Sequence, residues 1–325
     1  ESRPQHSIDP KLFGHFIEEL GNCFYDGIWS YSQHLQQLPM LIKDPSPGQL
    51  TKVRRDLFNA MSDLVTPDNN RQQGASILRW PGGCFSDVYH WKNGIGARET
   101  RPITNNDHWN SLLFRLLPKK EGEFGPIIPN QFGTDEFCTL CEKLGVEPYI
   151  NINYGTGTPE EAADWVEYVN GDRHSYWGAR RAQIHPEPYD VKYFGIANEI
   201  FGKWEVGHPK CVEDYGLRYL EFAKAMKMKD PKIRLVAVGL DPYAAMGFML
   251  VESGKGWNRR LLPIIKDYVD YLSCHLYLPG TGIIRNALST SSSFAFNEQA
   301  YWSILASPQH YERTIDGVWA DLESC

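Results

Sequence analysis

Short apolar stretches alternate with longer amphipathic stretches along most of this chain. The apolar stretches have the length of β-strands and cover residues 12–20, 76–80, 147–153, 192–197, 233–238 and 268–276. Apolar positions recur with a helical period over residues 50–64, 134–144, 159–170, 212–227, 258–268, 299–305 and 311–322. This alternation predicts parallel βαβ units. We therefore expect residues 1–325 to form one (β/α)8 TIM barrel domain that is incomplete, with strands one to six recognisable and strands seven and eight missing.

The predicted strand at 192–197 ends in an unusual pair of residues. Its apolar run is followed directly by Asn198 and Glu199. An unpaired buried carboxylate is costly, so a purely structural strand has no use for one at its tip. In a (β/α)8 barrel this tip is where active sites are built, and a carboxylic acid in a partly apolar pocket can donate a proton near neutral pH. The pattern favours a catalytic Glu199, with a helix cap or a lysine pair as the ordinary alternative.

Polar side chains also gather at the ends of other predicted strands. Glu18 lies near the end of the first, Arg79 and the Pro81-Gly82-Gly83 turn at the end of the second, Asn151 near the end of the third, and His275 near the end of the sixth. Each has an ordinary explanation as a helix-start acid, a structural ion pair, a tight turn or a core histidine. Because the carboxyl ends of parallel strands lie at one rim, together they predict a site there.

Composition narrows the choice of partners. The chain is 42% hydrophobic and 22% charged, as in ordinary globular proteins. Its net charge of −7 does not suggest a nucleic acid or an acidic membrane as partner. No apolar run approaches the ~18–20 residues that span a bilayer. The sequence starts at Glu1 without a signal-like segment, so cytoplasmic and secreted locations both stay open.

The cysteines favour free thiols. There are 7, an odd number, and most lie within apolar segments, which favours buried thiols over a disulfide framework. Cys138 and Cys141 have CxxC spacing in a helix-like stretch, but no second pair or nearby pair of histidines accompanies them. We predict two core-facing cysteines there, and neither a metal nor a cofactor for the protein. Gly155-Thr156-Gly157 lacks the remaining residues of a phosphate-binding loop.

Seven motifs follow one another from about Leu12 to the chain end. They are FGHFIE at 13–18, RWPGG at 79–83, YHWKNGIG at 89–96, NQFGT at 130–134, GTGTPEEA at 155–162, GIANE at 195–199 and HLY at 275–277. In this order they resemble the family 51 glycoside hydrolases, the α-L-arabinofuranosidases. The resemblance implies a retaining mechanism on a (β/α)8 barrel, with a β-sandwich domain alongside that is largely absent from this sequence.

The resemblance also implies roles for single residues. Glu199 matches the acid/base carboxylate, and Asn198 matches the amide that contacts the sugar 2-hydroxyl. Glu18 and Cys84 match residues that bind the furanose. Tyr277 is also placed among the substrate-binding residues, and with Arg79 it matches groups that orient the nucleophile and keep it ionised. The other supporting positions are His275, which matches a partner of the acid/base, and Trp91 and Trp204, which match aromatic residues of the cleft.

The nucleophile is the main departure from the family pattern. In the family it follows the seventh strand in an Asp-Glu-Trp-like motif, and no such motif follows Tyr277. The later acids, Glu298, Asp316, Asp321 and Glu323, lie in helix-like segments and match no nucleophile. Because Cys325 falls just before the expected seventh strand, we expect this sequence to be a portion of a longer enzyme.

The resemblance implies an exo-acting enzyme that releases terminal α-L-arabinofuranosyl groups from arabinoxylan, arabinan and derived oligosaccharides. It implies no cofactor and a homo-oligomer, a trimer or a hexamer. Two alternatives stay open. One is a sugar-binding remnant or inactive fragment that keeps Glu18, Asn198 and Tyr277 without a nucleophile. The other is a related retaining barrel glycosidase, such as an endo-glucanase or a xylosidase, although residues 82–84 and 155–162 favour the arabinofuranosidase.

Overall fold

A six-stranded parallel sheet forms the centre of the molecule, with strand order β1-β2-β5-β6-β7-β8. The computed structural model describes residues 9–19, 23–31, 50, 52–65, 76–106, 108, 127–243, 256–276, 302 and 308–325. The strands are His15–Phe16 (β1), Ile77–Trp80 (β2), Glu147–Ile152 (β5), Tyr193–Ile196 (β6), Arg234–Val238 (β7) and Tyr271–Ser273 (β8). A parallel sheet whose order follows the chain is what successive βα units of a (β/α)8 barrel produce. The predicted incomplete barrel is therefore present.

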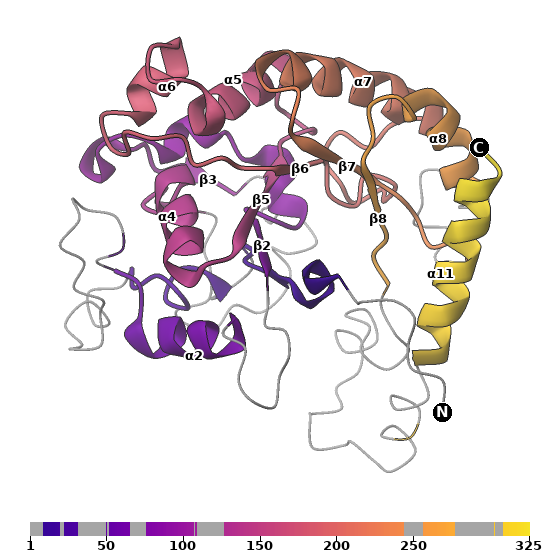
Figure 1. The fold of residues 1–325 in the computed structure, drawn as a ribbon, viewed down its shortest axis with the longest axis horizontal. Coiled ribbons are helices and arrows are strands. Elements are labelled where there is room, and N and C mark those ends of the chain that lie inside the picture. The colour runs from indigo at the N-terminus through magenta and orange to yellow at the C-terminus, as the bar shows by residue number, and fades with distance from the viewer. Residues whose placement is uncertain are drawn as a thin grey trace.

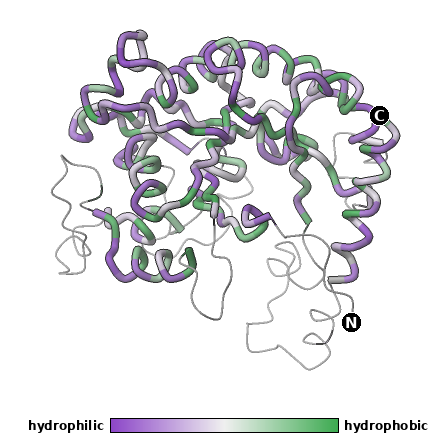
Figure 2. The backbone as a smooth tube through the Cα atoms, viewed as in Figure 1, coloured by the Kyte–Doolittle hydropathy of each residue, from purple (hydrophilic) through white to green (hydrophobic). Residues whose placement is uncertain are grey.

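Helices lie around the outer side of this sheet (Figure 1). They are α2 (Arg55–Val65), α4 (Thr134–Leu144), α5 (Pro159–Asn170), α6 (Tyr176–Arg181), α7 (Val212–Lys229), α8 (Trp257–Ile265) and α11 (Pro308–Glu323). Helix α5 is packed between α6 and α7. Hydrophilic and hydrophobic residues alternate along α5 and α7 (Figure 2), as expected for helices with one buried face. The buried Tyr215 of α7 reaches the sheet, where its hydroxyl donates to the Ile196 carbonyl at 3.0 Å.

Several short elements were not predicted. Four 3-10 helices cover Pro10–Phe13 (η1), Cys84–Val88 (η3), Trp91–Gly94 (η4) and Arg98–Thr100 (η5). Thr104–Asn105 (β3) pairs antiparallel with Ile127–Ile128 (β4). Elements of two to six residues, including α6, are too short to show a hydrophobic period. Within the described ranges, no helix is long and apolar enough to cross a bilayer.

The predicted bounds are wrong at several ends. Only His15–Phe16 of the first predicted strand joins the sheet, because Asp9 caps a 3-10 turn that begins at Pro10. The sixth strand is shorter than predicted, and helix α8 ends at Ile265 because residues 266–268 turn toward β8. Apart from Trp302, the predicted helix at 299–305 lies outside the described residues.

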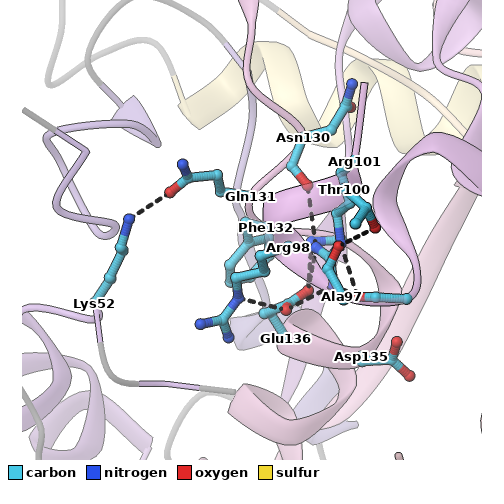
Figure 3. A network of polar contacts seen from close by, with 12 residues as sticks. Lys52, Ala97, Arg98, Thr100, Arg101, Asn130, Gln131, Phe132, Asp135 and Glu136 are labelled. Carbon is cyan, nitrogen blue, oxygen red and sulfur yellow. Dashed lines mark hydrogen bonds and ion pairs between the residues drawn. The ribbon is translucent and has the colours of Figure 1, made fainter. Parts of the chain in front are cut away.

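A buried ion-pair network anchors the start of α4 (Figure 3). Glu136 accepts hydrogen bonds from both terminal nitrogens of Arg101 at 3.0 Å and from Arg98 Nε at 2.9 Å. It also accepts from the Gly133 N–H at 2.8 Å, which satisfies a free donor at the helix start. Arg101 donates further to the Asn130 carbonyl at 3.0 Å. These bonds join residues 98–101 firmly to α4.

All seven cysteines are free, as predicted. Cys138 and Cys141 are both buried within α4, at the core-facing positions that their spacing predicted. The expectation of buried thiols is wrong for Cys23 and Cys325, which are exposed, because neither lies inside a main helix or a strand of the sheet.

Candidate active site

Two strand ends bring an acid and an imidazole together. Glu199 follows β6 and is 7% exposed, and His275 follows β8. His275 Nδ1 lies 2.8 Å from Glu199 Oε1. β7 lies between these two strands, so the contact crosses the width of one strand at the carboxyl edge of the sheet. The structure thus places His275 where the sequence resemblance expected a partner of Glu199.

Arg79 connects three strands of the sheet next to the Glu199–His275 pair. It lies on β2 and is 4% exposed. Its Nε donates to Asn151 Oδ1 on β5 at 3.3 Å, and a terminal nitrogen donates to Asn198 Oδ1 at 2.9 Å. The guanidinium carbon also lies 5.0 Å from the centroid of the Phe16 ring on β1. Because the guanidinium is planar and makes two directed bonds, it holds both amides in fixed positions.

The side-chain amide of Asn198 is oriented from both sides. Its oxygen accepts from Arg79, and its Nδ2 donates to Glu205 Oε1 at 2.9 Å. Nδ2 also lies 3.8 Å from the Cys84 sulfur. A donor against the oxygen and an acceptor against the nitrogen allow only one orientation of the amide. Asn198 therefore presents a defined pattern of polar atoms beside Glu199.

The turn that aims Asn198 and Glu199 has a strained backbone. Ala197 has φ of 76°, a value that residues other than glycine rarely adopt. The turn is held by two buried side chains: Asn151 Nδ2 donates to the Ala197 carbonyl at 3.1 Å, and the Asn198 N–H donates to Asp87 Oδ2 at 3.1 Å. Such strain is found where the surroundings fix a functional geometry. Burial, followed by the neighbouring Glu205 carboxylate, raises the pKa of Asp87 well above its usual range.

Glu18 joins the site from the end of β1. Its carboxylate lies against Gly83, where φ is 55° and an added Cβ would come within 1.6 Å of Glu18 Oε1. Glycine at position 83 therefore makes room for the acid. Burial raises the pKa of Glu18, Arg79 opposes this rise, Glu199 adds to it and His275 opposes it. These effects place Glu18 within electrostatic reach of the other site residues.

The prediction of a cleft position for Trp91 is wrong. Trp91 is 1% exposed, it stacks on Trp165 with ring centroids 5.7 Å apart, and its Nε1 donates to the Glu161 carbonyl at 2.9 Å. It belongs to the packing between η4 and α5 because its indole is enclosed by aromatic rings. Trp204 is half-buried and contacts Phe201 edge-on, with ring centroids 6.1 Å apart.

Some predicted residues do not reach the site or lie outside the described ranges. Tyr277 and Glu298 are among the residues that the structure does not describe. Asp321 lies on α11, where it accepts from Arg259 Nε at 2.6 Å and from Asn258 Nδ2 at 3.1 Å. These bonds attach α11 to α8, so Asp321 has a structural role, in agreement with its exclusion as a nucleophile.

Sequence reasoning missed several residues of the site. Asn151 and Asp87 hold the strained turn, and Glu205 holds the Asn198 amide. Asn151 belongs to the polar ending of the predicted strand at 147–153 but was given no role there, whereas Asp87 and Glu205 carry no local signal. The expectation that the protein has no metal stays a prediction, although donor atoms of Cys84, His108 and Glu205 all lie within 4.8 Å of one another. These three residues are distant in sequence, and only the fold assembles them.

Comparison with known proteins identifies the family. The model of the protein family described as "Alpha-L-arabinofuranosidase 1 domain" matches residues 71–287 of this chain. Alpha-L-arabinofuranosidase C of Emericella nidulans is 33% identical over 281 residues, which cover 86% of this chain and 48% of that protein. An intracellular exo-alpha-L-arabinofuranosidase of Bacteroides ovatus is 32% identical over 296 residues, which cover 91% of this chain and 48% of that protein. The chain spans about half the length of the curated relatives it matches.

Solved structures agree with this result. The GH51 arabinofuranosidase of Xanthomonas axonopodis pv. citri matches with a TM-score of 0.74 and 29% identity, over 99% of this chain and 55% of that one. An arabinose complex of the Thermotoga maritima α-L-arabinofuranosidase matches with a TM-score of 0.61 and 36% identity, over 81% of this chain and 45% of that one. Sequence and fold lead to one conclusion: the chain belongs to glycoside hydrolase family 51, the family of these α-L-arabinofuranosidases.

Proposed function

We propose that this protein is a retaining, exo-acting α-L-arabinofuranosidase and that this chain carries its acid/base carboxylate. The substrates we propose are the terminal α-L-arabinofuranosyl side chains of arabinoxylan, arabinan and their oligosaccharides. One observation carries the proposal: Glu199 and His275 are 2.8 Å apart at the carboxyl edge of the sheet, next to an Asn198 amide that Arg79 fixes. The names of the relatives support arabinofuranosides as the substrate class.

In the proposed mechanism, Glu199 protonates the glycosidic oxygen while a second carboxylate attacks the anomeric carbon. Glu199 then removes a proton from the water that releases arabinose with retained configuration. In retaining enzymes the two carboxyl groups lie ~5–5.5 Å apart. We assign the second carboxylate to none of the described residues. His275 fixes the orientation of the Glu199 carboxyl through both steps.

Asn198 and Glu18 recognise the sugar in this proposal. The Asn198 oxygen has a second lone pair beside its bond from Arg79, and a sugar hydroxyl can donate to it. Glu18 offers a carboxyl group to further hydroxyls from the end of β1. Because the Asn198 amide is already held in place, little reorganisation is needed when the transition state forms.

The test is release of arabinose from an aryl α-L-arabinofuranoside by the full-length natural polypeptide. Glu199→Ala should abolish release, whereas Glu160→Ala, at an exposed position of α5, should leave it unchanged. The configuration of the first sugar product, followed by NMR, should be retained. Arabinose binding without release would instead select the binding-only alternative, and faster hydrolysis of an aryl xyloside or glucoside would select a related glycosidase.

A further inference from the structure

Three side chains of metal-binding type converge beside Asn198. Cys84 lies at the start of η3, His108 follows β3, and Glu205 lies in the segment after β6. One donor atom from each lies within 4.8 Å of the others. His108 Nδ1 is 4.0 Å from Glu205 Oε2, and the side chains of these two residues are 5% and 0% exposed. His108 and Glu205 are therefore enclosed, Cys84 is half-buried, and together they offer one nitrogen, one oxygen and one sulfur donor.

The carboxylate of Glu205 is incompletely bonded. Oε1 accepts from Asn198 Nδ2 at 2.9 Å, whereas buried Oε2 has no hydrogen-bond partner among the described residues. A buried polar atom without a partner costs free energy, and a bound water or ion is among the ways in which proteins satisfy such an atom. An imidazole binds a metal ion through a ring nitrogen in its neutral form, and His108 Nδ1 is the ring nitrogen that lies 4.0 Å from Glu205 Oε2.

We propose that Cys84, His108 and Glu205 bind a divalent transition-metal ion, with Zn²⁺ the best fit and a fourth position open. Sulfur, nitrogen and oxygen donors together suit zinc, whereas Mg²⁺ and Ca²⁺ prefer oxygen alone. Zinc bonds of ~2.0–2.3 Å in a tetrahedron place the donors roughly 3.3–3.8 Å apart. Because the donors now lie within 4.8 Å of one another, each pair needs to approach by about 1.5 Å at most, which side-chain rotation can supply.

Binding changes the protonation of the cluster. Cys84 is a free cysteine, and a cysteine with the ordinary pKa of ~8.5 is a thiol near neutral pH. The metal replaces this proton: a zinc–sulfur bond forms, the sulfur–hydrogen bond breaks, and the proton passes to solvent. Metal binding must therefore release a proton and strengthen as the pH rises.

The position of the cluster links the metal to the sugar site, a step that rests on the proposed function. Asn198 Nδ2 contacts both Glu205 and Cys84, and Cys84 is one of the residues assigned to furanose binding. A metal held by Cys84 withdraws that side chain from the sugar. Zn²⁺ is thus expected to act as a reversible inhibitor that a chelator removes, and arabinose is expected to weaken Zn²⁺ binding.

Direct binding to the full-length, chelator-treated protein tests the metal site without an activity assay. Co²⁺ should produce a thiolate-to-cobalt charge-transfer band, and Zn²⁺ should displace it with a stoichiometry of about one. Calorimetry in two buffers of different ionisation enthalpy should show release of about one proton. Absence of the thiolate band, or an unchanged band in Cys84→Ser, would overturn the proposal.

Variants identify the ligands. His108→Ala and Glu205→Gln should each weaken Zn²⁺ binding by at least about tenfold, because even partners of metal ligands contribute ~10–100-fold. Glutamine at 205 keeps an oxygen for Asn198 Nδ2, so loss of fold is not expected, and circular dichroism verifies this. His174→Ala removes an exposed histidine outside the cluster and should leave binding unchanged. Equal affinity in Glu205→Gln and the natural protein would refute the assignment.

Measuring Zn²⁺ binding with and without arabinose tests the link between metal and sugar separately from the metal site itself. Arabinose that raises the apparent Kd for Zn²⁺ supports the link. Zn²⁺ bound by the three residues with a Kd unaffected by arabinose would retain the metal site and overturn the link. If the protein hydrolyses no arabinofuranoside, the cobalt spectrum still shows whether the metal site exists. Failure of the proposed function can therefore be distinguished from failure of the metal proposal.

Discussion

The imidazole of His275 lies against the carboxylate of Glu199, with Nδ1 and Oε1 2.8 Å apart. The two residues are 76 positions apart in sequence and follow strands β6 and β8. A carboxyl group that exchanges protons with a substrate needs a fixed direction, and a bonded imidazole supplies one. This relationship gives rise to two predictions about catalysis, both for the full-length natural polypeptide.

Replacing Glu199 by glutamine should affect substrates unequally. Turnover of arabinofuranosides with poor leaving groups should fall by ~10²–10⁴-fold, the usual contribution of a general acid, because the departing oxygen needs a proton. Aryl substrates with good leaving groups should lose far less in the glycosylation step. Comparing kcat/KM across a series of aryl arabinofuranosides measures this. An equal loss at both ends of the series would argue against the acid role.

His275→Gln should reproduce this pattern more weakly. Misplacement of the Glu199 carboxyl should lower kcat on the order of a hundredfold for poor leaving groups, with little change in KM. If His275 had only a structural role, its replacement would lower the turnover of all substrates equally. The dependence on the leaving group therefore distinguishes the two roles. His208→Gln is the matched control, since His208 lies in the segment after β6 and its Nδ1 is 3.0 Å from the backbone carbonyl oxygen of Glu205 instead of the Glu199 carboxyl.

Arg79→Lys should destabilise the fold and loosen the site. A lysine makes one point contact and cannot bond Asn151 and Asn198 simultaneously. With one buried amide oxygen left unpaired, the free energy of unfolding should fall by about 1–3 kcal/mol, measured by urea denaturation. Arg234→Lys serves as control because Arg234 lies exposed on β7. Similar small losses in both variants would mean that the two buried bonds contribute little.

The sheet was predictable because buried parallel strands are continuous apolar runs. β5, β6 and β7 differ from their predicted ranges by one residue at an end or at each end. The start of β1 was mispredicted because Leu12 and Phe13 are apolar but lie exposed in a 3-10 turn. Hydrophobicity alone does not record that Asp9 and Pro10 begin such a turn.

The candidate site was predictable only where a strand end carried the signal. Glu199 and His275 directly follow strands, and a shared rim implied that they lie close together. Glu205 and Asp87 act from segments whose position depends on the fold of distant residues, so no local pattern revealed them. Trp91 shows the opposite error: an aromatic residue in a family-like motif was placed in the cleft, whereas its ring fills the core.

The core position of Trp91 is itself testable. Trp91→Ala should lower the free energy of unfolding by about 3–5 kcal/mol, because a large enclosed ring is removed, and Trp91→Phe should cost less. Neither change should alter KM for an aryl arabinofuranoside in protein that remains folded. Trp204→Phe provides the comparison, because the Trp204 ring is half-buried and Trp204 is next to Glu205 in sequence. A raised KM together with unchanged stability in Trp91→Phe would instead support a position of Trp91 in the cleft.

Glu19 should make the stability of the protein depend on pH. Burial raises its pKa from 4.5 to about 8, and its Oε2 has no hydrogen-bond partner among the described residues. Between these two values the folded state holds a proton that the unfolded state has lost. The free energy of unfolding therefore falls as the pH rises through this window, by up to about 1.4 kcal/mol per pH unit from this group, and the contribution is lost above the folded pKa.

Glu19→Gln removes this dependence because a neutral amide does not titrate. The difference in unfolding free energy between variant and natural protein should shift in favour of the variant as the pH rises from about 5 to about 8, and then level off. Urea denaturation at several pH values measures it. Glu160→Gln, at an exposed position of α5, should show a difference that does not change with pH. Parallel pH profiles for Glu19→Gln and the natural protein would mean that the buried acid titrates identically in both states of the chain.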